Sequence, residues 1–365
     1  MADHGMATGT PQLESVGPIS FGPDDVLFVA DNKRAAIVAL DVADPSPAAA
    51  GEPFDFDDLD TKLASYLGCP VKDVFVRDLA VHPRTHNVYL SVMRGAGDAA
   101  RPAIVRVDRL DGSISALSLE GVAYSEVALG DAPAVDDERM EMSLAEGDEG
   151  EDVTFGDRTF RILRTPVRMS TVTDLKYADG TLLVAGLSNE EFASTLRRIP
   201  FPFTGDVAST GLEIFHVSHG QWETAAPIRT FVPYEDGTSI LASYTCTPLV
   251  HFPLRDLQPG AKAKGRTVAE LGSGNTPLDI VAFTRDGEEH LLISHTRHPL
   301  MKIACRDIDA QAPLTEPREP EGVPRQLPDL EGIGRMDNLN GDYVLAVQRD
   351  ADGRRHLRSL KTAGL

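Results

Sequence analysis

The feature of this sequence that most limits its fold is a pattern that recurs six times along the chain. In each copy a short apolar strand is followed by a polar turn, several of them Asp-Gly, and then by a second strand of aliphatic and β-branched residues. Such turns between apolar runs are typical of β-hairpins. The six copies occupy residues 19–31, 78–93, 174–187, 228–245, 279–296 and 333–348.

Self-similar units of this kind predict an all-β fold, a β-propeller. A third apolar strand often follows the hairpin, as at residues 35–42 and 102–109, and repeated units of three or four strands are the signature of propeller blades. The copies are unevenly spaced, so a further blade can be assembled from the long intervals or from both termini. We expect seven blades, with six as the alternative. Strands and helices do not alternate, which argues against a parallel α/β fold.

Two intervals depart from the repeat. Residues 56–76 carry Leu59, Leu63 and Leu67 at helical spacing, which predicts one short helix between the first two blades. Residues 131–152 hold ten acidic residues and one arginine, and we expect a solvated excursion from a blade. Residues 1–15 are expected to be a flexible N-terminal segment, and residues 16–365 a single propeller domain.

The charge of the chain excludes several classes of partner. The formal net charge is −21, whereas nucleic acids and anionic membranes attract clustered Lys and Arg. No run of 18 apolar residues predicts a membrane span, and the first residues lack the features of a secretory signal. We therefore expect a cytoplasmic protein, or a periplasmic or secreted one if a leader has been removed. Its three cysteines do not suggest a disulfide framework.

Two histidines and one cysteine form the main candidate metal site. His216 and His219 precede the first strand of one unit, and Cys246 follows the second strand of that unit, so the topology brings them together. In an extended strand the two histidines point to opposite faces, so both can bind one ion only if the strand ends or bulges between them. Imidazole and thiolate ligands suit copper, zinc or iron, and thiolate favours Cu(I). The alternative is that all three are structural residues.

A second histidine pair and two carboxylates complete the candidate site. His295 and His298 belong to the neighbouring unit and are expected at the same face, where they either extend the ligand set or bind a substrate. Glu223 follows His219 closely and is a candidate carboxylate for orienting a ligand or for acid–base catalysis. Asp279 is the second candidate catalytic carboxylate.

Repeated aspartates support a competing hypothesis. Asp78, Asp174 and Asp279 begin equivalent inner strands, and three such groups around one axis repel unless a cation or hydrogen-bond donors intervene. Together with the side chains of Asn32, Asn189 and Glu190, they could hold Ca²⁺. The alternative is that each aspartate fixes the neighbouring blade by accepting backbone N–H groups.

Four stretches of the sequence resemble a known group of proteins. They are VRDLAVHPRTHNVYLSVMRG, AGLSNEEFASTLRRIPFPF, LEIFHVSHGQWETAAPIRTFVPY and ASYTCTPLVHFPLRDLQPGAKAKG. On these stretches the chain from about residue 16 to residue 360 is similar to a group of bacterial propellers, of the YVTN type and like the β-chain of quinoprotein amine dehydrogenase. The resemblance implies a seven-bladed propeller and no particular activity, because this class includes scaffolds, lactonases and redox enzymes.

These patterns together lead to a functional hypothesis. We expect a copper oxidoreductase with its His/Cys site at the mouth of the propeller channel, acting on a small-molecule or peptide substrate. The alternatives are a non-catalytic propeller that binds a protein or peptide, and a calcium-dependent, lactonase-like hydrolase. The sequence leaves the oligomeric state open.

Overall fold

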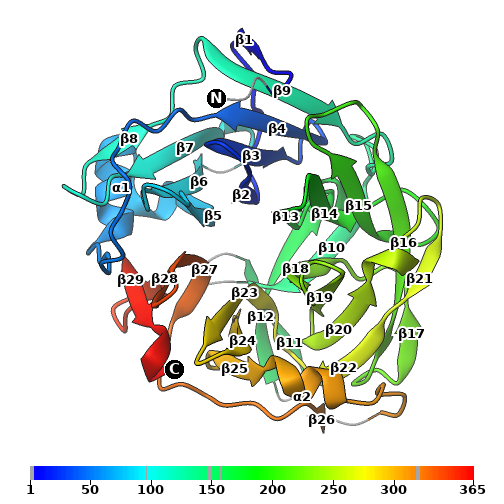
Figure 1. The fold of residues 1–365 in the computed structure, drawn as a ribbon. Helices are drawn as coiled ribbons and strands as arrows, with labels where there is room; N and C mark the ends of the chain where they lie inside the picture. Colours follow the sequence, from blue (N-terminus) through cyan, green and yellow to red (C-terminus); the bar gives the residue numbers. More distant parts are fainter. Residues whose placement is uncertain (1–3, 96, 146–149, 157, 318–320) are drawn as a thin grey trace.

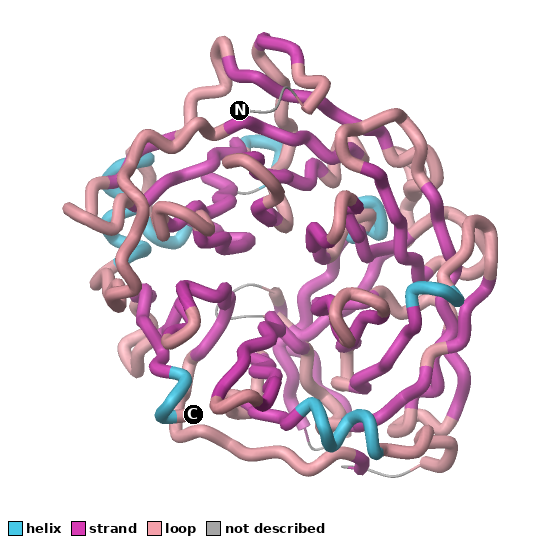
Figure 2. Tube along the Cα trace, in the orientation of Figure 1, coloured by secondary structure: helices cyan, strands magenta, loops and turns pink. Residues whose placement is uncertain are grey.

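The chain folds into a ring of β-sheets. The computed structural model describes residues 4–95, 97–145, 150–156, 158–317 and 321–365, and Figure 1 shows these sheets arranged around a central axis. Strands far outnumber helices, as Figure 2 shows. The all-β propeller expected from the hairpin repeat is confirmed.

All six expected hairpins are present, each with its third strand. The inner strands are β2 (Ile19–Phe21), β5 (Val74–Val81), β13 (Asp174–Ala178), β18 (Ile228–Tyr234), β23 (Pro277–Arg285) and β27 (Ile333–Asn340). The second strands are β3 (Val26–Asp31), β6 (Val88–Arg94), β14 (Thr181–Leu187), β19 (Ser239–Tyr244), β24 (Glu288–His295) and β28 (Tyr343–Arg349). The third strands are β4 (Ala36–Asp41), β7 (Arg101–Val107), β15 (Ser194–Pro200), β20 (Pro248–Pro253), β25 (Met301–Ala304) and β29 (Arg355–Lys361).

Further strands extend four of the blades outward. Fourth strands are β9 (Val122–Ala128) beside β4, β8 (Ile114–Ala116) beside β7, β16 (Ala208–His216) beside β15 and β22 (Arg266–Glu270) beside β20. The outermost strands are β1 (Ala7–Gly9) on β9, β17 (Gln221–Glu223) and β21 (Lys262–Lys264) on β16, and β26 (Glu321–Gly322) on β22. The pairing of β1 with β9 corrects the expectation of a flexible N-terminus for residues 7–9.

The described residues form six blades, which corrects the favoured expectation of seven. Around the axis the inner strands contact one another in the closed order β5, β2, β13, β18, β23, β27 and back to β5. Each interface between neighbouring blades encloses its own buried apolar cluster, so six clusters fill the six interfaces of the described ring. Burial of apolar side chains between the sheets is therefore what holds the ring together.

The order of blades in space differs from their order in the sequence. The blade that contains β5 is second along the chain, yet it lies between the first and last blades. After completing it, the chain returns as β9 to supply the fourth strand of the first blade. The interval that suggested an additional blade is therefore partly used to finish an earlier one.

Short helices connect the blades. The expected helix is α1 (Leu59–Leu67), whose Leu59 and Leu63 are fully buried between the second and last blades. A second helix that the sequence analysis did not identify is α2 (Cys305–Ala310). Single 3₁₀ turns are η1 (Val71–Asp73), η2 (Gly97–Ala99), η3 (Val167–Ser170), η4 (Leu254–Asp256) and η5 (Thr362–Gly364). No helix in the described part of the chain is long and apolar enough to cross a membrane.

The acidic interval is more ordered than a solvated excursion. It contributes to a three-stranded sheet outside the ring, formed by β10 (Met140–Leu144), β12 (Arg158–Pro166) and β11 (Glu151–Phe155), although residues 146–149 and 157 lie outside the described part. Glu141 forms an ion pair with Arg229, which lies near the start of inner strand β18. Glu141 also accepts a hydrogen bond from the Ser170 hydroxyl. The sheet therefore rests on the ring at the face where inner strands begin.

Candidate metal centre

A tight turn brings the two histidines of the candidate site together. Strand β16 ends at His216, and the backbone N–H groups of His219 and Gly220 both donate to the carbonyl of His216, at 3.2 and 2.8 Å. The chain then returns as β17, which pairs with the end of β16. Because the strand ends at His216, the two histidines are not held on opposite faces of one extended strand. Their imidazole centroids lie 3.8 Å apart.

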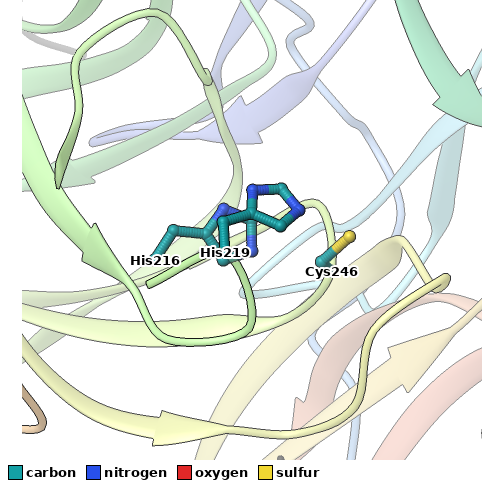
Figure 3. Close-up of side chains that lie close together, drawn as sticks. All are labelled: His216, His219 and Cys246. Atoms are coloured by element: carbon teal, nitrogen blue, oxygen red, sulfur yellow. The ribbon is translucent and has the colours of Figure 1, made fainter. Parts of the chain in front are cut away.

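Cys246 reaches the same place from the next blade. It occupies the turn between β19 and β20, where its N–H donates to the carbonyl of Asn275 at 2.7 Å. One ligand atom from each of His216, His219 and Cys246 lies within 4.8 Å of the others, as Figure 3 shows for the side chains. The histidine and cysteine residues that the sequence suggested as principal ligands therefore converge.

The cysteine is held in an unusual backbone conformation. Cys246 and Thr247 both have φ of 62°, in the left-handed region that residues with a β-carbon avoid. Such conformations cost free energy and persist only where the surrounding structure enforces them. Here they occur in the turn that brings the thiol within 4.8 Å of a ring nitrogen of each imidazole.

Glu223 connects the two imidazoles. Its two carboxylate oxygens contact His216 Nδ1 at 2.8 Å and His219 Nδ1 at 2.7 Å. Burial alone would raise the pKa of Glu223, but the hydrogen bonds from His216 and His219 outweigh it and hold the pKa at about 2. An ionised Glu223 accepts both Nδ1–H groups, which leaves each Nε2 as the remaining ligand atom.

The environment of the two imidazoles differs. His216 is 3% exposed, and its Nε2 is buried without a hydrogen-bond partner among the described residues. The side chain of His219 is 46% exposed. A buried imidazole nitrogen without a partner is costly unless water or an ion satisfies it. The cluster therefore has one buried side and one side open to solvent.

A further carboxylate beside the cluster was missed from the sequence. Glu270, at the end of β22, is fully buried and accepts a hydrogen bond from the N–H of Ser218 at 3.3 Å. Ser218 lies between the two histidines, and Glu270 pairs across the sheet with Pro248, two residues after Cys246. No local pattern connects Glu270 to the histidines in the sequence, so only the pairing of β20 with β22 reveals it.

The second histidine pair forms a separate group. His295 ends β24, and its ring centroid lies 6.3 Å from that of His298, but the three-residue cluster described above includes neither residue. Burial lowers the pKa of His295 to about 3, and its Nδ1 lies 3.4 Å from the carbonyl of Pro299. The expectation that this pair extends the ligand set is therefore not met by the arrangement of the described residues.

The axial aspartates fix neighbouring blades to one another. Asp78, Asp174 and Asp279 each accept the N–H of the following residue and an N–H from the inner strand of the adjacent blade. The partner N–H groups belong to Ile19, Phe231 and Met336, at 2.8 to 2.9 Å. Asp279, expected to be catalytic, thus has the structural role given above as the alternative.

The calcium hypothesis is weakened by a lysine at the centre of these carboxylates. Lys176 Nζ lies 3.4 Å from Asp174, and the charges of Asp279 and Asp78 also act on it. The ammonium group already supplies the cation that the aspartates require. The side-chain amide of Asn32 is bonded to the backbone of Val172 on both sides, rather than presented as a ligand.

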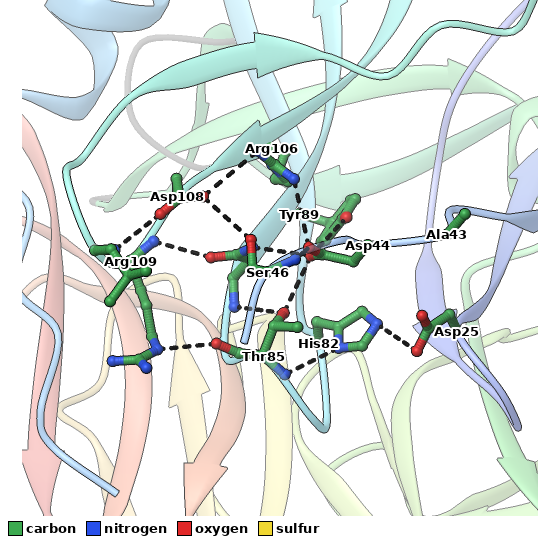
Figure 4. Close-up of polar contacts among 12 residues, drawn as sticks. Asp25, Ala43, Asp44, Ser46, His82, Thr85, Tyr89, Arg106, Asp108 and Arg109 are labelled. Carbon is green, nitrogen blue, oxygen red and sulfur yellow. Dashed lines mark hydrogen bonds and ion pairs between the residues drawn. The ribbon is translucent and has the colours of Figure 1, made fainter. Parts of the chain in front are cut away.

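A second polar network lies within the blades that contain β3 and β6. Asp44 is buried and accepts hydrogen bonds from Thr85 Oγ1, Asn87 Nδ2 and Tyr89 Oη, at 2.9 to 3.0 Å (Figure 4). His82 contacts Asp25 through Nε2 at 3.0 Å. Because the polar atoms of Asp44 are satisfied internally, this network serves to hold loops together.

Comparisons with known proteins agree with the fold alone. No family of known proteins matches the sequence, and neither does any curated protein. Among solved structures, the chain is similar to a putative 6-phosphogluconolactonase from Bacteroides uniformis, with 12% identity over 98% of this chain and 79% of the other, at a TM-score of 0.34. It is similar to a PQQ-bound aldose sugar dehydrogenase from Streptomyces coelicolor, with 13% identity over 97% of this chain and 96% of the other, at a TM-score of 0.37. It is also similar to virginiamycin B lyase from Staphylococcus aureus, with 12% identity over 98% of this chain and 98% of the other, at a TM-score of 0.35. Similarity at this level carries no argument about activity, and the resemblance to YVTN-type propellers stays a prediction.

Proposed function

We propose that the chain binds one copper ion through His216, His219 and Cys246 and acts as a copper-dependent oxidoreductase. The observation that carries this proposal is the convergence of the three side chains, with Glu223 holding both Nδ1 atoms. Two neutral imidazoles and one thiolate form a ligand set that suits Cu(I) and Cu(II). The bound ion supplies one-electron chemistry.

The arrangement of the protein side chains supports access to such an ion. Three protein ligands leave a coordination position open, as catalytic sites require, and the half-exposed imidazole of His219 places this position near solvent. A copper ion held by His216, His219 and Cys246 would supply one-electron redox chemistry toward a small reducing substrate at this position. Glu223 accepts both Nδ1–H groups, so both Nε2 lone pairs would be available to hold an ion.

Metal analysis of protein purified without a histidine tag tests this proposal. After loading with copper or zinc and removal of free metal, the parent should retain one copper per chain, and Cys246→Ser should retain much less. Cys69→Ser is the matched control, because Cys69 packs against the apolar cluster beside α1. A parent without metal after loading would overturn the proposal. A site that holds zinc but not copper would overturn the oxidoreductase, because zinc has no redox chemistry.

A further inference from the structure

The axis of the ring contains a cavity that the proposed metal centre does not use. Inner strands pair with only one neighbour each, so their other edges face the axis with backbone N–H and C=O groups. A cavity of about 180 Å³ lies among them, and its polar lining includes Ser20, Lys176, Asp337 and Asn338. The rest of its lining is apolar.

This cavity lies away from the face that carries the metal centre. The axial aspartates stand near the start of the inner strands, and that face also carries the turn of Cys246, because the end of β19 pairs with the start of β18. Lys176 is two residues beyond Asp174, and Ala282 is three residues beyond Asp279. The cavity is therefore displaced toward the opposite face, where Asn338 is exposed.

The two charged side chains that line the cavity have opposite signs. The Lys176 ammonium opposes a bound cation, and the Asp337 carboxylate opposes a bound anion. A neutral ligand avoids both penalties. To satisfy the lining it must accept hydrogen bonds from the Lys176 ammonium and donate them to Asp337 or to backbone carbonyls.

The apolar lining and the volume narrow the ligand further. Leu79, Val232 and Ile280 supply walls that suit carbon-bound hydrogens. A cavity of roughly 150 Å³ accommodates benzene, so about six to ten non-hydrogen atoms fit here. We propose that the axial cavity binds a small neutral polyhydroxylated molecule, a short polyol of about three to five carbons.

A size-blocking variant with a matched control tests this site. Ala282 lines the cavity, so Ala282→Leu fills part of it, whereas Ala282→Ser keeps the space. Titration calorimetry with glycerol, erythritol and xylitol should detect binding of at least one compound to the parent and to Ala282→Ser. Binding to Ala282→Leu should be at least about tenfold weaker, which corresponds to about 1.4 kcal/mol.

A second variant removes a polar group without filling space. Asn338 is exposed and its side-chain amide donates to the carbonyl of Ala282, so Asn338→Ala should fold and bind the same polyol more weakly. Ethanolamine, acetate and calcium should not compete. The proposal is overturned if none of the three polyols binds, if a charged compound binds in their place, or if Ala282→Leu binds as tightly as Ala282→Ser while melting like the parent.

Discussion

At the scale of single residues, the backbone of Cys246 is the most informative feature of the candidate site. A left-handed φ is normal for glycine and strained for cysteine, so a turn selected for stability alone would favour glycine at this position. The presence of cysteine indicates that its side chain contributes something that glycine cannot. The proposed metal ligand is such a contribution.

This argument predicts opposite effects on stability and metal binding. In metal-free protein, Cys246→Gly should be more stable than Cys246→Ala by about 1 kcal/mol, because only glycine adopts the left-handed conformation without strain. Both variants should lose the bound metal, because both lack the thiol. Urea unfolding and metal content measured on the same preparations check this.

A result in which alanine is as stable as glycine would mean that the turn relaxes when the thiol is removed. Retention of full metal by either variant would remove Cys246 from the ligand set.

A second prediction concerns the carboxylate that holds both imidazoles. Glu223→Gln keeps the size of the side chain but provides one acceptor oxygen in place of two, so only one Nδ1–H can be held. Metal affinity should fall about 10- to 100-fold, as for other residues that orient metal ligands. Competition with a chelator of known affinity measures the change.

The surface pair of Glu191 and Lys262 provides the control for this substitution. Glu191 is exposed and forms its ion pair with Lys262, not with a histidine, so Glu191→Gln should leave the metal affinity unchanged. Equal affinities for the Glu223 and Glu191 variants would contradict a positioning role for Glu223.

The residues of the candidate site show what sequence alone could provide. His216, His219 and Cys246 were identified together, because the hairpin repeat places the end of one blade beside the second strand of the next. The double contact of Glu223 depends on the tight turn after His216, which pairs β17 with β16, and could not be derived from spacing. Lys176 was missed because a single lysine in an inner strand carries no pattern.

At the scale of secondary-structure elements, the acidic interval behaves differently from what its composition suggests. Its strands form a sheet, and Glu141 is mostly buried in its ion pair with Arg229. Removing one partner of such a pair leaves the other charge poorly solvated. We therefore expect Glu141→Ala to lower the free energy of unfolding by about 1 to 3 kcal/mol, as measured by urea denaturation.

The neighbouring Glu138 provides a matched control in the same segment. Its side chain is exposed, so Glu138→Ala should change stability by less than about 0.5 kcal/mol. Similar small effects for both substitutions would indicate that the sheet does not depend on the ring, as a solvated excursion would behave.

The elements also explain why hairpins were predicted well and blades were not. Alternating apolar residues and Asp-Gly turns act locally, so the six hairpins could be located from the sequence. The number of blades depends on which later strand completes which sheet. Strand β9 follows the second blade in sequence but completes the first blade. No local sequence pattern indicates this pairing.

At the scale of the whole molecule, four axial aspartates link four of the six neighbouring pairs of inner strands in the described ring, all in one rotational sense. Asp78, Asp174 and Asp279 each bond to the next inner strand in the order β5, β2, β13, β18, β23, β27, and Asp337 bonds Val81 to complete the step from β27 to β5. These contacts concentrate carboxylates on the axis. Ring closure and charge repulsion are therefore coupled in this molecule.

That coupling predicts how stability depends on pH. Burial, together with the charge of Asp279, raises the pKa of Asp78 to about 7, and burial raises the pKa of Asp337 to about 6. In the unfolded chain both titrate near pH 4. Between about pH 4 and 7 the folded protein thus binds more protons than the unfolded chain, so stability should fall as pH rises through this window. Below it, stability should also fall, because hydrogen bonds outweigh burial and hold the pKa of Glu223 at about 2.

We therefore expect the free energy of unfolding to be greatest near about pH 4 and lower at pH 7 to 8, each raised aspartate contributing at most about 1.4 kcal/mol per pH unit. Asp78→Asn cannot ionise, so its stability should depend less steeply on pH between 5 and 7 than that of the parent. The exposed Asp286→Asn serves as the control and should keep the parental slope. Urea unfolding across this range measures all three proteins. A parent whose stability rises from pH 5 to pH 8 would show that the axial carboxylates are ionised and fully compensated by Lys176 and Arg335, so that closing the ring involves no charge penalty.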